Sequence, residues 1–175
     1  MNDNRRPAST VDPTGEFPLD LTTYVFHLFT VVARHREARL EAALRPLALN
    51  VSRHRALSSI DHLAPCTMRE LAEFMAVDRT TLTRTLDQLA DAGLVERTTP
   101  REDRRQVVLT LTAAGKTACR RSLQAIYRVN RDLLEAMCED EQRALARGLD
   151  RLVGRLATDS DLLNRLRLSD ARPPG

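Results

Sequence analysis

Between residues 79 and 92, apolar and polar side chains recur at the spacing of a helix with two different sides. With about 3.6 residues per turn, three leucines fall together on one side, and short or cationic groups fall on the other. An arginine can donate two hydrogen bonds to guanine, and threonines can contact phosphates or thymine methyl groups. This pattern is typical of a helix that reads base edges in the major groove. The apolar side consists of Leu82, Leu86 and Leu89, and the polar side and its flanks consist of Thr80, Thr81, Thr83, Arg84 and Asp87.

A second group of cations lies in the polar loop 99–105. The segments before and after it, Leu94–Thr98 and Gln106–Leu111, favour strands, so the region predicts a β-hairpin with a charged tip. Guanidinium groups suit the narrow, electronegative minor groove beside a helix in the major groove. Asp103 is placed to pair with the arginine two residues later and so to orient it. The cations of this loop are Arg101, Arg104 and Arg105.

Local charge matters more here than the formal net charge of +3. Segment 78–111 holds six arginines and six acids, whereas segment 31–55 holds six arginines and two glutamates. Arg53 and Arg55 are therefore candidates for the phosphate contacts that dominate affinity, although they could equally serve only to solubilise the surface. The predicted DNA-binding residues are Arg53, Arg55, Thr67, Arg79, Thr80, Thr81, Thr83, Arg84, Arg101, Asp103, Arg104 and Arg105.

The elements that must position these groups are two short helices joined by a tight turn. Thr67 and Glu70 have the spacing of a capping box and predict a helix over Met68–Met75. Residues 76–78 then form a brief turn. Asp78 caps the next helix, from Arg79 to about Ala92, which Gly93 ends in a left-handed conformation.

Longer helices flank this module. Helical spacing runs from Asp20 until Pro46, and Asn50 caps a second helix that ends near Pro65. Thr112 caps a long helix that reaches about Cys138, and Asp140 opens the last helix. The first helix is apolar on more than one side and needs cover that a second subunit would supply.

The sequence thus predicts a mainly α fold with a small β-hairpin wing (α+β), in which a winged helix-turn-helix is flanked by dimerisation helices. The expected organisation is a disordered arm over 1–19, helical dimerisation segments over 20–46 and 112–168, a DNA-binding domain over 47–111 and a flexible tail over 169–175.

Composition narrows the class of protein further. Three cysteines without C-x-x-C spacing do not predict a disulfide framework and favour a reducing cytoplasm. The basic N-terminal stretch lacks the apolar core of a signal peptide, and no apolar run is long enough for a membrane anchor. No nucleophile elbow, phosphate loop or metal motif is present, so the sequence predicts neither an enzyme nor a bound cofactor or metal.

The segment VDRTTLTRTLDQLADAGLVERTTPREDRRQVVLTLTAAG resembles the MarR family, the multiple-antibiotic-resistance type of bacterial regulator. The matching motifs are GLVER at 93–97, the D-x-R pair of Asp103 and Arg105, and LTAAG at 111–115. The resemblance implies a homodimer that presents two winged modules to a pseudo-palindromic operator. It also implies a repressor that a small aromatic or amphipathic ligand, oxidation or a metal releases.

The sequence says least about the signal that would release such a repressor from DNA. His35 and His54 are candidates to border an effector cleft, although a histidine on a helix surface is the simpler interpretation of each. Cys66, just ahead of a helix start, is expected to be a small apolar filler; the alternative is a redox sensor whose pKa the helix dipole lowers. His62 and Cys66 lack further ligands for zinc. A winged helix that serves as a protein-interaction scaffold is the rival function.

Overall fold

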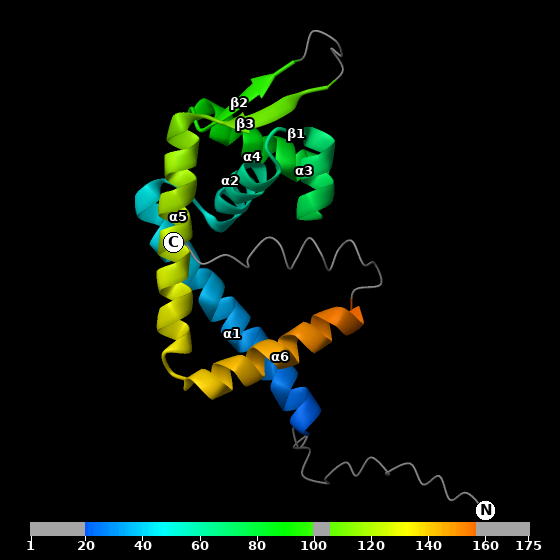
Figure 1. Cartoon of the computed structure of the whole chain (residues 1–175), viewed down its shortest axis with the longest axis vertical. Helices are drawn as coiled ribbons and strands as arrows, with labels where there is room; N and C mark the ends of the chain where they lie inside the picture. The colour runs from blue at the N-terminus through cyan, green and yellow to red at the C-terminus, as the bar shows by residue number, and fades with distance from the viewer. Residues whose placement is uncertain (1–19, 100–105, 157–175) are drawn as a thin grey trace, which may run out of the picture. The chain divides into compact units, whose positions relative to one another are not determined.

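The computed structural model describes residues 20–99 and 106–156. Figure 1 shows that the described residues are mainly helical, with short strands at one end of α5. The residues of the predicted arm, the tip of the wing and the tail lie outside the described ranges. The elements are α1 (Leu21–Leu44), the 3-10 helix η1 (Arg45–Leu47), α2 (Val51–Leu63), β1 (Cys66–Thr67), α3 (Met68–Met75), α4 (Arg79–Asp91), β2 (Val95–Thr98), β3 (Val108–Leu111), α5 (Ala113–Leu134) and α6 (Glu139–Leu156).

Capping side chains set where several of the helices begin. Each cap accepts a hydrogen bond from a backbone N–H that no helical carbonyl can reach. The distances are 2.8 Å for Arg53 N to Asn50 Oδ1 and 2.8 Å for Thr81 N to Asp78 Oδ1. The predicted caps Asn50, Thr67, Asp78 and Thr112 are all confirmed.

The chain divides into two units, Met1–His35 and Arg36–Gly175. The second unit holds the hydrophobic core, which leucines of α2, α3, α4 and β3 build with the end of α1. Removing a leucine side chain from water stabilises the fold by about 1.5–3 kcal/mol. The largest fully buried apolar side chains are Leu44, Leu57, Ile60, Leu71, Leu82, Leu86, Leu89 and Leu109.

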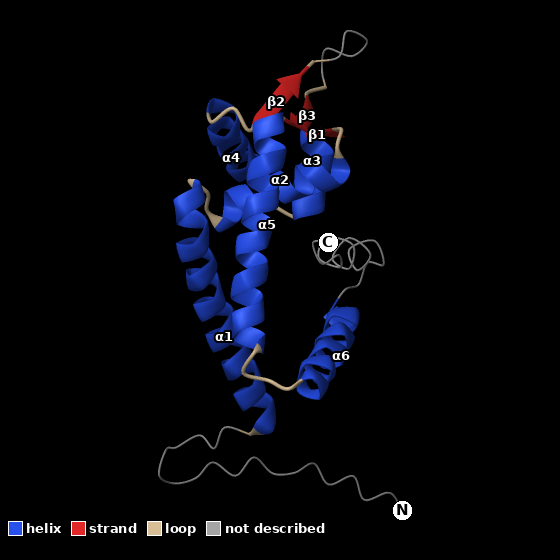
Figure 2. Ribbon diagram, turned by 60° about the vertical axis from the view of Figure 1, so that its left-hand side comes forward, coloured by secondary structure: helices blue, strands red, loops and turns tan. Residues whose placement is uncertain are grey.

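The sheet has one more strand than the predicted hairpin. The strand order is β1-β3-β2, and both pairings are antiparallel. Cys66 pairs with Leu109 and Thr67 with Val108, so the residues that start α3 are attached to the second strand of the hairpin. A strand of two residues has no period that sequence could reveal. Figure 2 shows the strands beside α2, α3 and α4.

The junction between the hairpin and α5 explains the glycine of the LTAAG motif. Thr112 N donates to Leu94 O at 3.1 Å, which brings the first turn of α5 against that backbone. A Cβ atom built on Gly115 would lie 1.9 Å from Leu94 O. Only glycine allows so close an approach. Gly93 has φ +67°, the left-handed conformation predicted for it.

The end of α5 differs from the prediction. The helix stops at Leu134 instead of about Cys138, and α6 begins at Glu139 instead of Asp140. The cause is a pair of side-chain caps. Glu141 Oε2 accepts from Cys138 N at 2.8 Å, and Gln142 Nε2 donates to the carbonyls of Leu134 and Met137 at 2.9 and 3.0 Å. These bonds satisfy backbone groups that a continuous helix would have used.

Several large apolar side chains stay exposed. The first unit contains most of them, and a few more lie on α5 and α6. Within residues 20–99 and 106–156, no helix combines the length and apolar composition needed to cross a membrane. The exposed apolar residues of α1 are Leu21, Tyr24, Val25, Phe26, Leu28, Phe29 and Val32.

Candidate nucleic-acid interface

Helix α4 has the two sides that its sequence predicts. Leu82, Leu86 and Leu89 are each at most 1% exposed and hold the helix on the core. The opposite face is open and combines small hydroxyls, one guanidinium, one carboxylate and one amide. Such a surface can enter a groove without large side chains in the way. The exposed residues are Thr80, Thr81, Thr83, Arg84, Asp87 and Gln88.

Two threonine hydroxyls of this face bond within the chain. Thr81 Oγ1 donates to Asp78 Oδ2 at 2.7 Å, and Thr83 Oγ1 donates to Arg79 O at 2.7 Å. With its proton used in this way, each hydroxyl can only accept a further hydrogen bond from a partner. The sequence predicts a contact role for these threonines but does not reveal that their protons are used inside the protein.

Arginines from neighbouring elements hold the two flanks of the α4 face. Toward the sheet, Arg97 Nη2 of β2 lies 2.7 Å from Asp87 Oδ1. Toward α2, the guanidinium of Arg53 donates to Gln88 Oε1 through Nε at 3.1 Å and Nη2 at 3.0 Å. The pair with Arg97 offsets the charge of Asp87, one of the acids that made the module neutral overall.

A hollow of about 330 Å³ lies between the start of α2 and this face of α4. Arg84 borders it and has no hydrogen bond or ion pair with the described part of the chain, so its guanidinium is available. Arg53 borders it as well, but three of its N–H groups are used inside the protein, the third donating to Ala48 O at 3.1 Å. The lining residues are Asn50, Ser52, Arg53, Thr81, Arg84, Thr85 and Gln88.

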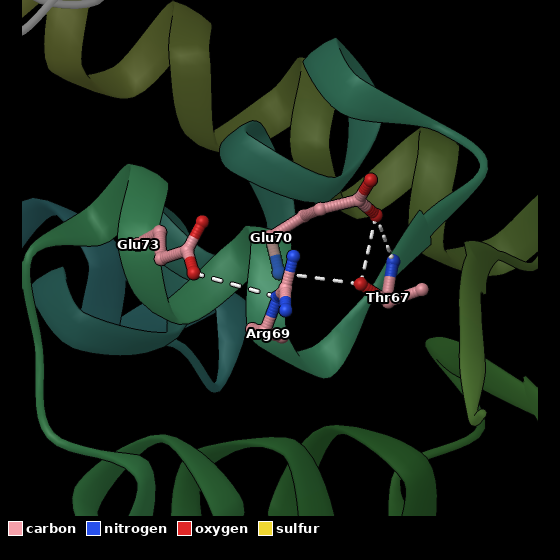
Figure 3. A network of polar contacts seen from close by, with 4 residues as sticks. All are labelled: Thr67, Arg69, Glu70 and Glu73. Carbon is pink, nitrogen blue, oxygen red and sulfur yellow. Dashed lines mark hydrogen bonds and ion pairs between the residues drawn. The ribbon is translucent and has the colours of Figure 1, made fainter. Parts of the chain in front are cut away.

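A second hollow, of about 350 Å³, lies at the start of α3 beside Gln106 and Val107, which precede β3. Thr67 and Glu70 meet there in the predicted capping box (Figure 3). Glu70 Oε2 accepts from Thr67 N at 2.7 Å and from Thr67 Oγ1 at 2.8 Å, and these bonds lower the pKa of Glu70. The hydroxyl of Thr67 therefore already donates and accepts. Arg79 also lines this hollow.

Of the other predicted DNA contacts, two are exposed arginines in the described residues and four belong to the wing. Arg55 and Arg79 are exposed, and neither forms an ion pair with residues of the described ranges. Both can therefore meet a phosphate without breaking a contact. Arg101, Asp103, Arg104 and Arg105 lie outside the described residues.

The prediction that His54 lies on the helix surface is wrong, because its side chain is buried. It is 7% exposed, and its Nδ1 lies 2.8 Å from Ser122 Oγ of α5. Ser122 Oγ donates to Cys119 O at 2.8 Å, so it accepts the proton of His54 Nδ1. His54 thus joins α2 to α5 inside the core, whereas His35 is exposed as predicted. The partner, Ser122, gave no signal because polar core residues do not stand out from a helical pattern.

The environment of Cys66 does not lower the pKa of its thiol, as the redox-sensor alternative requires. Its thiol is 3% exposed, and burial, with a smaller contribution from Glu70, raises its pKa to about 11. Burial likewise raises the pKa of Cys119 to about 11. The helix start does not compensate for the lost solvation. Cys66 is buried as expected of a small apolar filler, and the structure offers no support for the alternative of a redox sensor at this position.

Gln88 is the interface residue that sequence reasoning missed. It stands one turn after Arg84 on the same exposed side of α4, and that spacing was the available signal. No group of three or more His, Cys, Asp or Glu side chains within the described residues is arranged to hold a metal ion.

The chain is similar to proteins of one family. The family model for the MarR family matches residues 49–107. The Multiple antibiotic resistance protein MarR of Escherichia coli (strain K12) is 31% identical over 119 residues, which cover 67% of this chain and 83% of that protein. The crystal structure of a cysteine-to-serine mutant of MarR from E. coli, complexed with operator DNA, aligns with a TM-score of 0.68 at 27% identity and covers 79% of this chain and 99% of that one. A MarR-family regulator from Silicibacter pomeroyi shares the fold at 22% identity, with a TM-score of 0.64 over 81% of this chain and 96% of its own.

Proposed function

This chain belongs to the MarR family of transcriptional regulators, and we propose that it binds a pseudo-palindromic operator as a homodimer and represses transcription until an effector releases it. The solved complex of the E. coli relative with operator DNA supports the DNA-binding part. We found no catalytic motif in the sequence and no metal-binding cluster in the described residues, so no observation favours an enzymatic function.

The observation that carries the proposal is the exposed face of α4. The apolar side of α4 is buried in the core, and its opposite side presents Arg84 and short polar groups to a binding partner. Arg84 is suited to donate to guanine O6 and N7, and each such contact discriminates by about 1–3 kcal/mol. Thr80 and Thr83 flank it and would meet thymine methyl groups or phosphates.

Phosphate contacts would come from the elements around α4. Arg55 on α2 and Arg79 at the start of α4 are exposed cations, and the wing residues Arg101, Arg104 and Arg105 are proposed for the minor groove with Asp103 orienting one of them. Thr67 and Thr81 lie near helix starts, but their N–H groups already bond Glu70 and Asp78, so any contact they make would use the remaining hydroxyl lone pairs. Arg53 is not placed among the phosphate contacts because its N–H groups already bond Gln88 and Ala48.

The exposed apolar residues support the homodimer. Leu21, Phe26 and Phe29 belong to a contiguous stretch of α1 that a monomer would leave in water. Leu145 and Leu152 on α6 are 44% and 43% exposed. A second copy would cover such surfaces, and its two-fold symmetry would require half-sites about 10 bp apart.

An effector site is the least supported part of the proposal. A hollow of about 380 Å³ lies between the end of α1 and α5, with Ala43, Leu47 and Val129 among its apolar lining. Two cations, Arg121 and Arg128, and one carboxylate, Asp132, also line it. An aromatic or amphipathic anion suits that combination. His54 is buried against Ser122 and is not proposed as a ligand contact.

The test is selection of binding sites from a random duplex library with the full chain, followed by affinities for the selected and scrambled duplexes at two salt concentrations. A steep salt dependence and a preference of at least about 10³-fold are expected of a specific regulator. Arg84→Ala should relax the preference at one position of each half-site, and Arg131→Ala on α5 serves as the control.

Weak, equal binding to all duplexes would contradict the proposal and favour a protein-interaction scaffold. Equal loss on selected and scrambled DNA for Arg84→Ala would contradict the role of α4 as the reading helix. The intergenic DNA upstream of the gene should contain the selected sequence if the regulator controls its own expression.

A further inference from the structure

The contact between Arg53 and Gln88 joins α2 to the reading face of α4. Arg53 Nε and Nη2 both donate to Gln88 Oε1, at 3.1 and 3.0 Å. A third N–H, on Nη1, donates to Ala48 O, and the backbone N–H of Arg53 is bonded to Asn50 Oδ1. The arginine is therefore attached at its backbone and at its guanidinium besides its contact with α4. Its position is set by the start of α2.

This contact determines which way the amide of Gln88 faces. Arginine has five N–H donors and no acceptor, so only the oxygen of the amide can face it. The two N–H groups of Arg53 use both lone pairs of that oxygen. Gln88 Nε2 is left pointing away from Arg53, and within the described residues no group accepts a hydrogen bond from it.

An amide held in this way has a restricted set of partners on DNA. A glutamine that reads adenine accepts from N6 with its oxygen while it donates to N7 with its nitrogen. Gln88 cannot do both while Arg53 occupies its oxygen. It can still donate to an acceptor that offers no proton in return, which is a backbone phosphate oxygen, O6 or N7 of guanine, or O4 of thymine.

We propose that Gln88 is a donor-only contact to the operator and that Arg53 is the positioning residue that enforces this and excludes adenine. The inference rests on the proposed function, since it requires that α4 faces DNA. It gives Arg53 a role through Gln88 in place of the phosphate contact expected from sequence. Arg84, one turn earlier on α4, would stand beside Gln88 as the cationic contact.

Three substitutions test the proposal, each assayed by library selection and by affinity on the selected duplex. Gln88→Ala removes the donor and should weaken binding roughly 3- to 10-fold, as expected for one neutral hydrogen bond. Gln88→Glu keeps an acceptor for Arg53 but cannot donate and repels phosphate, so it should weaken binding more than Gln88→Ala. Gln124→Ala, an exposed glutamine on α5, is the control.

Arg53→Met is the decisive variant because it keeps much of the side-chain stem and releases the oxygen of Gln88. Selection with this variant should newly enrich adenine at the position that Gln88 faces. The enrichment should disappear in the double variant with Gln88→Ala. Unchanged melting temperatures of the variants establish that the fold is intact.

The outcomes show whether Gln88 donates to a phosphate or to a base. They also distinguish failure of this inference from failure of the proposed function. Loss on all duplexes alike for Gln88→Ala indicates a phosphate, and loss of a guanine or thymine preference at one position indicates that base; both results support the inference. Wild-type affinity and preference for Gln88→Ala, or adenine at that position already in wild-type selections, would overturn it while leaving the regulator intact. Failure of the wild type to select any sequence would overturn the proposed function instead.

Discussion

The winged module and the beginning of α1 contain the same kinds of apolar residue but expose them very differently. In the module, leucines of α2, α3, α4 and β3 lie in one core, and Leu86 is fully buried. Along the first turns of α1, Phe26 and Phe29 are 56% and 54% exposed. The module closes its own core, whereas the beginning of α1 leaves apolar surface for another surface to cover.

This difference indicates where stability and assembly reside. Apolar burial inside the module stabilises one chain irrespective of concentration. Apolar surface left outside contributes only when a second surface covers it, which makes its contribution depend on concentration. Four measurements test this division, beginning with the largest expected effect.

Leu86→Ala should damage the closed region most. Deleting a buried leucine side chain costs about 2–5 kcal/mol of unfolding free energy because the remaining cavity cannot fully collapse. The measurement is urea unfolding. Leu145→Ala, at a position 44% exposed, should cost less, and its cost should increase with protein concentration if a second copy covers it. Equal costs for both variants at low concentration would contradict the division.

Phe26→Asp should damage the open region without unfolding the module. A charge placed in a covered apolar patch should weaken a dimer by about 2 kcal/mol or more, which is roughly 30-fold in its dissociation constant. Sedimentation measures the association, and operator affinity should fall with it. Ala42→Asp, at an exposed position on the opposite side of α1, is the control. A dimer that tolerates Phe26→Asp would place the interface elsewhere.

The cysteines sharpen the comparison through their reactivity. Cys66 and Cys119 are buried, with pKa values raised to about 11, and only a small fraction of each is thiolate near neutral pH. Cys138 is exposed between α5 and α6. An alkylating reagent should therefore label Cys138 first in the native protein and all three cysteines after denaturation. Faster labelling of Cys66 would revive its role as a redox sensor.

Asp78 should contribute a small, pH-dependent part of the stability of the closed module. Its hydrogen bonds with Thr81 lower its pKa below the usual range of an aspartate, so the folded state binds its proton less readily than the unfolded state does. Its contribution is fully present above the unfolded pKa and is lost as pH falls through the lower folded value. Asp78→Asn keeps the helix cap but cannot bind a proton, so the free energy of unfolding should fall slightly less steeply as the pH is lowered. The measurement is urea unfolding at a series of acidic pH values. An identical pH profile would contradict the assignment.

Sequence reasoning was most reliable where the interaction lies within one helical turn. The caps at Asn50, Thr67, Asp78 and Thr112 each bond an N–H three residues later, so local spacing was enough to predict them. It was wrong about the end of α5, where Glu141 and Gln142 intervene from the next helix. It also missed β1, which exists only through its pairing with β3.

In the candidate site, too, sequence predicted what depends on one helix and missed what depends on contacts between elements. The face of α4 with Arg84 and the threonines follows from periodicity, because a rigid helix fixes the direction of each side chain once the apolar side is known. The partners of those side chains do not follow from periodicity. Asp87, for example, pairs with Arg97 of β2, which no helical pattern predicts.

By itself, the sequence determined which segments are helical, which side of each faces the core and which side chains cap the helix starts, because those properties depend on neighbours a few residues apart. Only the tertiary structure decided that Arg53 holds Gln88, that Arg97 holds Asp87 and that His54 bonds Ser122. These partners come from different elements, as far as 68 residues apart for His54 and Ser122. A hydrogen bond depends on distances of a few tenths of an ångström, and such distances exist only after the elements have packed.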